Sequence, residues 1–210
     1  MKLPEENGGG DFKPTPAGQH VAVLTRLIDL GTQPGSQMFP DPRRKILMGW
    51  EIPGERVEWE KDGVKHEGPV LHYERMTFSS HEKSIMRQRL ESWRGKPFSE
   101  EEFGTFDMKT LLEVGAFLQI SHDHKDGRTY ANMQAIMLPL GGKDAWPKPE
   151  GEVVYVSLDE DFDDLEFAKL SDKLKETIGN SPEYKALTGE KQPETQSENP
   201  AAGLDDDIPF

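Results

Sequence analysis

The chain has no cysteine, so disulfide frameworks, thiolate metal sites and cysteine nucleophiles are excluded. It also lacks any run of about 18 apolar residues, the length that a membrane-spanning helix needs. Its first residues contain no apolar segment of the kind found in secretory signal peptides. A Walker loop, a dinucleotide-binding glycine pattern and a serine nucleophile elbow are absent as well. The sequence therefore predicts a cytoplasmic protein that is not an enzyme, needs no cofactor and has no membrane partner.

Negative charge exceeds positive charge, and most of the excess lies in the last third of the chain. The 210 residues have a formal net charge of −14. Residues 1–149 contain 20 Lys and Arg against 22 Asp and Glu, whereas residues 150–210 contain 5 against 17. A nearly neutral body can carry a basic face that the whole-chain charge conceals. Nucleic acid is therefore a candidate ligand for the body.

The body contains five stretches with the composition of β-strands. Each is rich in apolar, β-branched or aromatic residues and is bounded by turn-forming residues. The first stretch lacks single-face alternation, as expected of a long strand that bends. Asp62 and Gly63 predict the turn of a separate hairpin with two short arms, which stands between the second and third strands. Asp126 and Gly127 predict a turn between the last two strands. The expected strands are residues 20–33, 43–52, 70–78, 116–122 and 129–138.

Helical spacing replaces the strand pattern after residue 78. Ser79 with Glu82 fits a capping box, and apolar residues recur at helical spacing as far as Trp93. Gly95 ends this pattern. We therefore expect a helix over about residues 81–94.

A second short helix is expected after Asp107, which can act as its N-cap, and Gly115 would end it. The resulting order, with helices between the third and fourth of five strands, is that of the OB-fold, a five-stranded Greek-key barrel. The predicted fold class is therefore mainly β with helical insertions. An SH3-like barrel or an α+β sheet with helices on one face fits the same order.

Four regions follow from these patterns. Residues 1–19 form a flexible lead-in, and residues 20–149 the OB-fold domain. Residues 150–188 are an acidic extension with an edge strand and a helix, packed on the barrel. Residues 189–210 are polar and contain Pro, which predicts a disordered acidic tail. The expected inward stripe of the acidic helix is Phe162, Leu165, Leu170, Leu174 and Ile178.

Sequence-tolerant binding of single strands needs cations along a groove and aromatic faces for base stacking. Trp50 and Trp93 follow the apolar periodicity of their elements and are expected in the core. Trp59, flanked by glutamates in a polar hairpin, is the favoured stacking residue. The candidate DNA-binding residues are Arg43, Arg44, Lys45, Trp59, Lys61, Tyr73, Arg75, Lys125, Arg128 and Tyr130.

Two patterns suggest metals only weakly. His122 and His124 form an H-x-H pair with Asp123 and Asp126 nearby, but they stand at a predicted turn without a further ligand cluster. The acidic run from residue 159 lacks the Gly and Glu that an EF-hand loop requires at its sixth and twelfth positions. The sequence therefore predicts no metal site.

The last residues, "DDDIPF", combine three carboxylates with a large apolar end that follows a polar linker. This segment resembles the C-terminal tip of bacterial single-stranded DNA-binding proteins, in which an acidic run followed by Ile-Pro-Phe recruits replication and repair enzymes. The body departs from those proteins, and a divergent, phage-encoded protein that carries the host tip would explain both observations. The resemblance implies that host replication and repair enzymes bind Asp205, Asp206, Asp207, Ile208, Pro209 and Phe210.

The leading hypothesis is a non-catalytic protein that binds and protects single-stranded DNA during replication, recombination and repair. An OB-type adaptor that recruits replication enzymes without binding DNA is an alternative from another class. A strand-annealing recombination protein is a further alternative. Whether the chain forms a homo-oligomer stays open.

Overall fold

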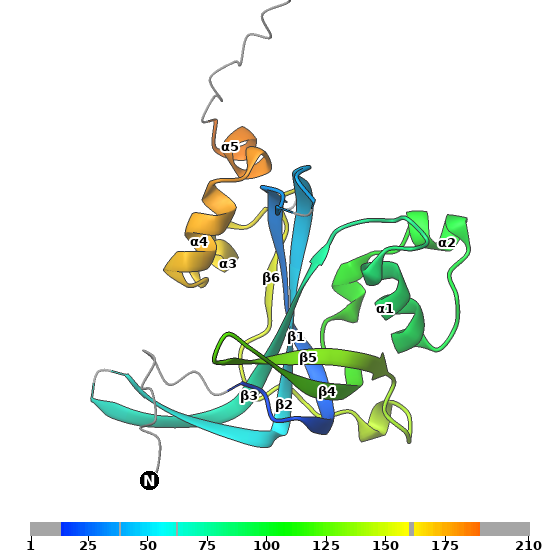
Figure 1. Ribbon diagram of the computed structural model, residues 1–210, viewed down its shortest axis with the longest axis vertical. Helices are drawn as coiled ribbons and strands as arrows, with labels where there is room; N and C mark the ends of the chain where they lie inside the picture. Colours follow the sequence, from blue (N-terminus) through cyan, green and yellow to red (C-terminus); the bar gives the residue numbers. More distant parts are fainter. Residues whose placement is uncertain (1–13, 38, 62, 160–161, 190–210) are drawn as a thin grey trace, which may run out of the picture.

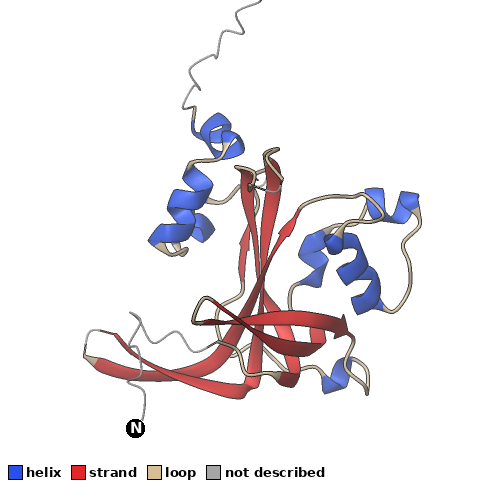
Figure 2. Cartoon of the chain, viewed as in Figure 1, coloured by secondary structure: helices blue, strands red, loops and turns tan. Residues whose placement is uncertain are grey.

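The computed structural model describes residues 14–37, 39–61, 63–159 and 162–189 (Figure 1). This part of the chain is mainly β, as predicted: an antiparallel sheet curls into a half-barrel. Figure 2 shows short helices on two sides of the sheet. Most of the expected lead-in and nearly all of the expected tail lie outside the described residues. No helix among the described residues is long and apolar enough to cross a membrane.

Five long strands form the sheet in the spatial order β3-β2-β1-β4-β5, and each neighbouring pair is antiparallel. All five predicted strands are present. β2 and β3 are longer than predicted, because the hairpin arms expected around residue 62 continue both strands. A short sixth strand in the expected extension pairs in parallel with β1. The strands are β1 (Gly18–Gln33), β2 (Arg43–Lys61), β3 (Val64–Thr77), β4 (Gly115–Lys125), β5 (Arg128–Met137) and β6 (Val154–Val156).

The helices form two groups on different sides of the sheet (Figure 1). One group follows β3, and the other follows β6 near the upper end of β1. A single 3-10 turn, η2, lies between β5 and β6. The helices are α1 (Ile85–Arg94), α2 (Glu100–Gly104), η1 (Met108–Leu111), η2 (Lys143–Ala145), α3 (Asp164–Ala168), α4 (Asp172–Gly179) and α5 (Pro182–Thr188).

β1 bends, as its irregular pattern predicted. Its segment Gly18–Val23 pairs with β4, and its segment Val23–Gln33 pairs with β2. The register with β2 shifts twice, after Leu24 and after Asp29. Such bulges increase the local twist and bend of a strand. The sheet therefore curls around β1.

Side chains of α1 close the gap between the two ends of the sheet. β3 and β5 end the strand order, and α1 packs against both. Arg89 on α1 donates to the carbonyls of Met133 and Gln134 on β5, and lies 3.4 Å from the Glu74 carboxylate on β3. These bonds satisfy β5 carbonyls where a β3–β5 ladder would otherwise close a barrel.

The main core lies inside the half-barrel, between the curled sheet and α1. Trp50 and Trp93 are 1% and 2% exposed, so both are confirmed as core residues. Their ring centroids are 6.0 Å apart in an edge-to-face arrangement. Aromatic pairs of this geometry contribute beyond the area they bury. The two tryptophans thus join β2 to α1.

The predicted start of the first helix is wrong by four residues. Ser84 is the N-cap of α1, and the box expected from Ser79 and Glu82 does not form because that stretch is a loop. A capping box does exist at the start of α2, where Ser99 and Glu102 exchange hydrogen bonds. These two pairs share one sequence signature, and of the two only Ser99 with Glu102 caps a helix.

Asp107 caps η1, as predicted, by accepting a hydrogen bond from the N–H of Lys109. Gly115 was expected to end this helix, but it begins β4 instead. A Cβ atom on Gly115 would lie 2.4 Å from the Trp146 ring. This glycine is therefore needed because Trp146 packs closely on the strand.

The C-terminal extension packs against β1 around a second buried cluster, as predicted. The prediction of a single acidic helix is wrong. The segment forms two short helices: Asp163 caps α3, and Ser171 stands at the N-cap position of α4. Leu165 does not belong to the inward stripe, because it is 76% exposed. The other four members pack in the cluster, and Leu170 and Ile178 are buried.

Candidate nucleic-acid interface

The outer face of β2 and β3 collects several of the predicted DNA-binding residues. Even-numbered residues of β2 from 46 to 52 point into the core, so Lys45 and Gly49 lie on the outer face. On β3, Tyr73 stands opposite Gly49 in register, and Arg75 stands opposite Leu47. Lys45, Tyr73 and Arg75 therefore share one surface.

The Tyr73 ring lies close to Gly49 on the neighbouring strand. A Cβ atom on Gly49 would lie 2.7 Å from Tyr73 Cε1 and 2.8 Å from Arg26 Cβ, so only glycine leaves room for the ring there. Burial raises the pKa of Tyr73, and the nearby Arg26 opposes that shift. The side chain is nevertheless 42% exposed. Tyr73 thus offers an open aromatic surface next to a guanidinium group.

A groove of about 460 Å³ adjoins this surface. Residues from both faces of β3 line it, together with the loop before α1, so it follows the free edge of β3. Glu74 is the only carboxylate in the lining, and it faces Arg89 at 3.4 Å. The basic side chains in the lining are Arg43, Lys45, Arg75, His81 and Lys83.

The cations of the groove are not neutralised by the described part of the chain. Arg43, Arg75 and Lys83 have no carboxylate within ion-pair distance among those residues. The Lys45 ammonium donates to Thr77 Oγ1 at 2.7 Å, which leaves its charge unpaired. In a chain of net charge −14, adjacent unpaired cations indicate a site for an anionic ligand.

Arg44, also predicted to bind DNA, lies in a different environment. Its guanidinium is bound by the carboxylates of Asp29 and Asp159. The hydrogen bond with Asp29 is the main cause that raises the pKa of Arg44 far above its ordinary value. Arg44 therefore links β2 to β1 and to the segment after β6, and it is not part of the groove lining.

The hairpin arm places Trp59 on the other side of β3. The Trp59 ring stacks on His66 with centroids 5.6 Å apart and covers Gly68. His66 and Gly68 are even-numbered positions of β3, so they face away from Tyr73. Trp59 is 47% exposed, but it does not adjoin the groove. Lys61 belongs to β2, and its side chain is outside the described part.

The β4–β5 hairpin carries the remaining predicted residues. Tyr130 pairs with Asp123 across the hairpin, and Lys125 pairs with Arg128. All of them are exposed, and none lines the groove. The structure therefore separates this hairpin from the groove beside the outer face of β2 and β3.

The two histidines of the H-x-H pair make separate hydrogen bonds within the fold. His122 Nε2 hydrogen-bonds with the Thr15 carbonyl at 2.7 Å, and His124 Nδ1 with Thr129 Oγ1 at 3.1 Å. Asp123 lies on the opposite face of β4. Among the described residues, no group of three or more His, Asp or Glu side chains is arranged to hold a metal ion.

Sequence reasoning missed four residues of the candidate site. Arg26 and Gly49 lie in strands, where register rather than local pattern brings them to Tyr73. His81 and Lys83 were assigned to the first turn of a helix, whereas they belong to the loop that lines the groove. Ser79, Ser80 and Ser84 are equally good N-cap residues, so the local sequence does not show that the helix begins after Ser84.

Comparison with known proteins yields neither a matching family model nor a similar curated protein. The segment that resembles the bacterial tip, residues 205–210, lies outside the described residues. The geometry of the groove and of the outer face must therefore carry any functional conclusion about the body.

Proposed function

We propose that this protein binds single-stranded DNA without catalysis, through the groove and the outer face of β2 and β3. The observation that carries the proposal is the set of unpaired cations, Arg43, Lys45, Arg75 and Lys83, around one groove of an acidic chain. Phosphates of a strand would neutralise them and release counterions. Tyr73 supplies the neighbouring aromatic surface on which a base can stack.

The sheet order supports an OB-type barrel as the scaffold. Strand β1 pairs with both β2 and β4, β3 and β5 end the order, and α1 between β3 and β4 packs on both end strands. An OB-fold has this Greek-key connectivity and binds oligonucleotides on the face formed by strands 2 and 3. The groove and Tyr73 lie on that face and along its edge.

The tip adds a second role to the proposal, supported by the sequence alone. Asp205–Asp207 followed by Ile208–Phe210 offers carboxylates and an aromatic ring to a partner with an apolar pocket and a basic rim. Recruitment of host replication and repair enzymes in the cytoplasm, by a phage-encoded protein, fits this chemistry. Coating of a strand and recruitment of enzymes would then reside in separate parts of one chain.

Fluorescence anisotropy with a labelled oligo(dT) strand and a duplex of equal length tests the proposal. We expect tighter binding of the single strand and an affinity that falls steeply as salt is raised. Equal or absent binding of both ligands at low salt would contradict it and would favour the adaptor. Faster pairing of complementary strands in the presence of the protein would indicate the annealing alternative.

A pull-down tests the role of the tip separately. Full-length protein should retain host replication and repair enzymes, and Phe210→Ala should lose them, since truncating an aromatic anchor costs at least about 2 kcal/mol. Deletion of residues 205–210 should leave strand affinity the same or raise it, because the acidic tip then no longer competes with phosphates for the groove. Equal recovery by both forms would exclude a partner-binding tip.

A further inference from the structure

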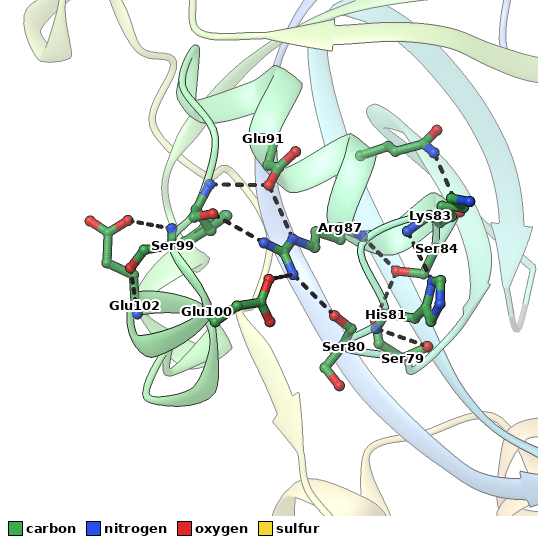
Figure 3. Close-up of polar contacts among 12 residues, drawn as sticks. Ser79, Ser80, His81, Lys83, Ser84, Arg87, Glu91, Ser99, Glu100 and Glu102 are labelled. Carbon is green, nitrogen blue, oxygen red and sulfur yellow. Dashed lines mark hydrogen bonds and ion pairs between the residues drawn. The ribbon is translucent and has the colours of Figure 1, made fainter.

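The loop Ser79–Ser84 between β3 and α1 is held in one shape by the fold (Figure 3). Ser84 Oγ donates to the Ser79 carbonyl at 2.9 Å, which closes the loop on itself. The buried Arg87 on α1 donates to the Ser80 carbonyl at 3.4 Å. Arg87 is fixed in turn by carboxylates on both sides of it. The loop is therefore already ordered before any ligand arrives.

Two side-chain donors of this loop, on His81 and Lys83, line the groove and have no hydrogen-bond partner among the described residues. The N–H of Lys83 donates to His81 Nδ1 at 3.1 Å, so the neutral ring carries its proton on Nε2. Among the described residues, neither that Nε2–H group nor the Lys83 ammonium has a partner. Arg43 and Arg75 line the same groove. The one carboxylate in this lining, Glu74, faces Arg89 instead of these donors.

We infer that the Ser79–Ser84 loop binds a phosphate group of the DNA strand, with His81 Nε2 and Lys83 Nζ as its donors. The inference rests on the proposed function and extends it, because the loop lies beyond the outer face of the sheet. A phosphodiester carries one negative charge and several acceptor oxygens, which suits a neutral donor next to an ammonium. The bound strand then crosses the free edge of β3 from Tyr73 and Arg75 towards α1.

The salt dependence of oligo(dT) binding tests the role of Lys83. For Lys83→Ala, the slope of log affinity against log salt should become shallower by about 0.7, the value for one phosphate contact on a single strand. Affinity at low salt should fall roughly fivefold, as for one exposed charge pair. Lys96→Ala is the matched control, since Lys96 is exposed just after α1 and lies outside the groove lining. That control should match the wild type in both quantities.

His81→Ala tests the neutral donor. Loss of one hydrogen bond should weaken strand binding about twofold or more. Circular dichroism should show that both loop variants remain folded. A slope for Lys83→Ala equal to that of the wild type and of Lys96→Ala would overturn the inference while leaving the proposed function intact.

Free phosphate shares the same chemistry, so a second ligand distinguishes the source. In NMR titrations, inorganic phosphate should perturb the amides of His81 and Lys83 only weakly, and oligo(dT) should displace it. If phosphate binds the loop and saturating oligo(dT) does not displace it, the loop is a free-anion site and the inference is wrong. If the wild-type protein binds no strand at all, the proposed function fails first.

Discussion

Two neighbouring regions use the same residue types in opposite ways. In the corner between α1 and α2, the Arg87 side chain is 5% exposed and donates to the carboxylates of Glu91 and Glu100 (Figure 3). It also donates to the Phe98 carbonyl at 3.0 Å and lies over the Phe103 ring. In contrast, Arg43, Arg75 and Lys83 line an open groove, and none of them has a carboxylate partner among the described residues.

The difference separates cations that hold the fold from cations that are free for a ligand. A buried guanidinium needs partners for its donors, since an unpaired buried charge is costly. An exposed cation needs no such partner, because water solvates it. Neighbouring exposed cations repel one another, and a bound anion relieves that repulsion. Pairing therefore says more about function here than the number of basic residues does.

The largest effect on stability is expected for Arg87→Ala. The change removes a donor that serves two carboxylates and two carbonyls of the corner, so the melting temperature should fall more than for any single substitution in the groove. Arg87→Lys keeps the charge but loses the planar guanidinium with its several donors. Its melting temperature should lie between those of the wild type and Arg87→Ala. Thermal unfolding followed by circular dichroism measures this, and an unchanged melting temperature would place Arg87 with the free cations.

His72 should make stability depend on pH on the acidic side. Its Nδ1 contacts Thr15 Oγ1 at 3.1 Å, and burial together with the nearby His20 lowers its pKa to about 4. The unfolded state takes up the proton near pH 6.5, but the native state resists it until about pH 4. Stability contributed by neutral His72 is thus present above pH 6.5 and is lost as pH falls, by up to about 3 kcal/mol.

Urea unfolding at pH 7 and pH 5 checks this expectation. His72→Asn should show a smaller loss between the two pH values than the wild type, because it has no imidazole to protonate. Equal losses in both proteins would mean that carboxylates alone cause the acid sensitivity.

Charge reversal in the groove should affect binding and leave the fold intact. We expect Arg43→Glu with Arg75→Glu to weaken oligo(dT) binding about a hundredfold at low salt and to reduce the salt slope by about 1.4, for two lost phosphate contacts. Lys173→Glu with Lys175→Glu in α4 changes the net charge equally and serves as the control. If the control weakens binding as much, total charge rather than the groove determines affinity.

The smallest effect separates the two exposed aromatic residues. Tyr73→Leu should cost about 1–3 kcal/mol of strand affinity, as for one stacked base, with little change in the salt slope. Trp59→Leu should cost less, because Trp59 lies on the opposite face of β3 from Tyr73 and does not line the groove. Anisotropy titrations at two salt concentrations measure both, and a larger effect of Trp59 would move the interface to the hairpin arm.

Much of the fold could be predicted because strand patterns are local. Alternation along residues 43–52 identified β2, its core face and the burial of Trp50. Helix starts were harder, since Ser79, Ser84 and Ser99 all have the chemistry of an N-cap. Helix α1, which packs on β3 and β5, begins after Ser84. The acidic segment divides into α3, which the Asp163 side chain caps, and α4, which begins after Ser171.

The sequence predicted which types of residue line the candidate site, but not which of them lie together. Arg43, Lys45, Tyr73 and Arg75 were named from the sequence, and they share one surface. Arg44 stands between two of them in sequence, yet it pairs with Asp29 on β1 because alternate residues of a strand face opposite sides.

The sequence by itself determined the strands and most of the core. These follow from short-range periodicity and composition, which need no knowledge of distant contacts. The tertiary structure alone decided which cations are neutralised and which are free. That outcome depends on partners far apart in the chain, such as Arg44 with Asp159 and Arg87 with Glu100, and on the strand register that lays Tyr73 over Gly49.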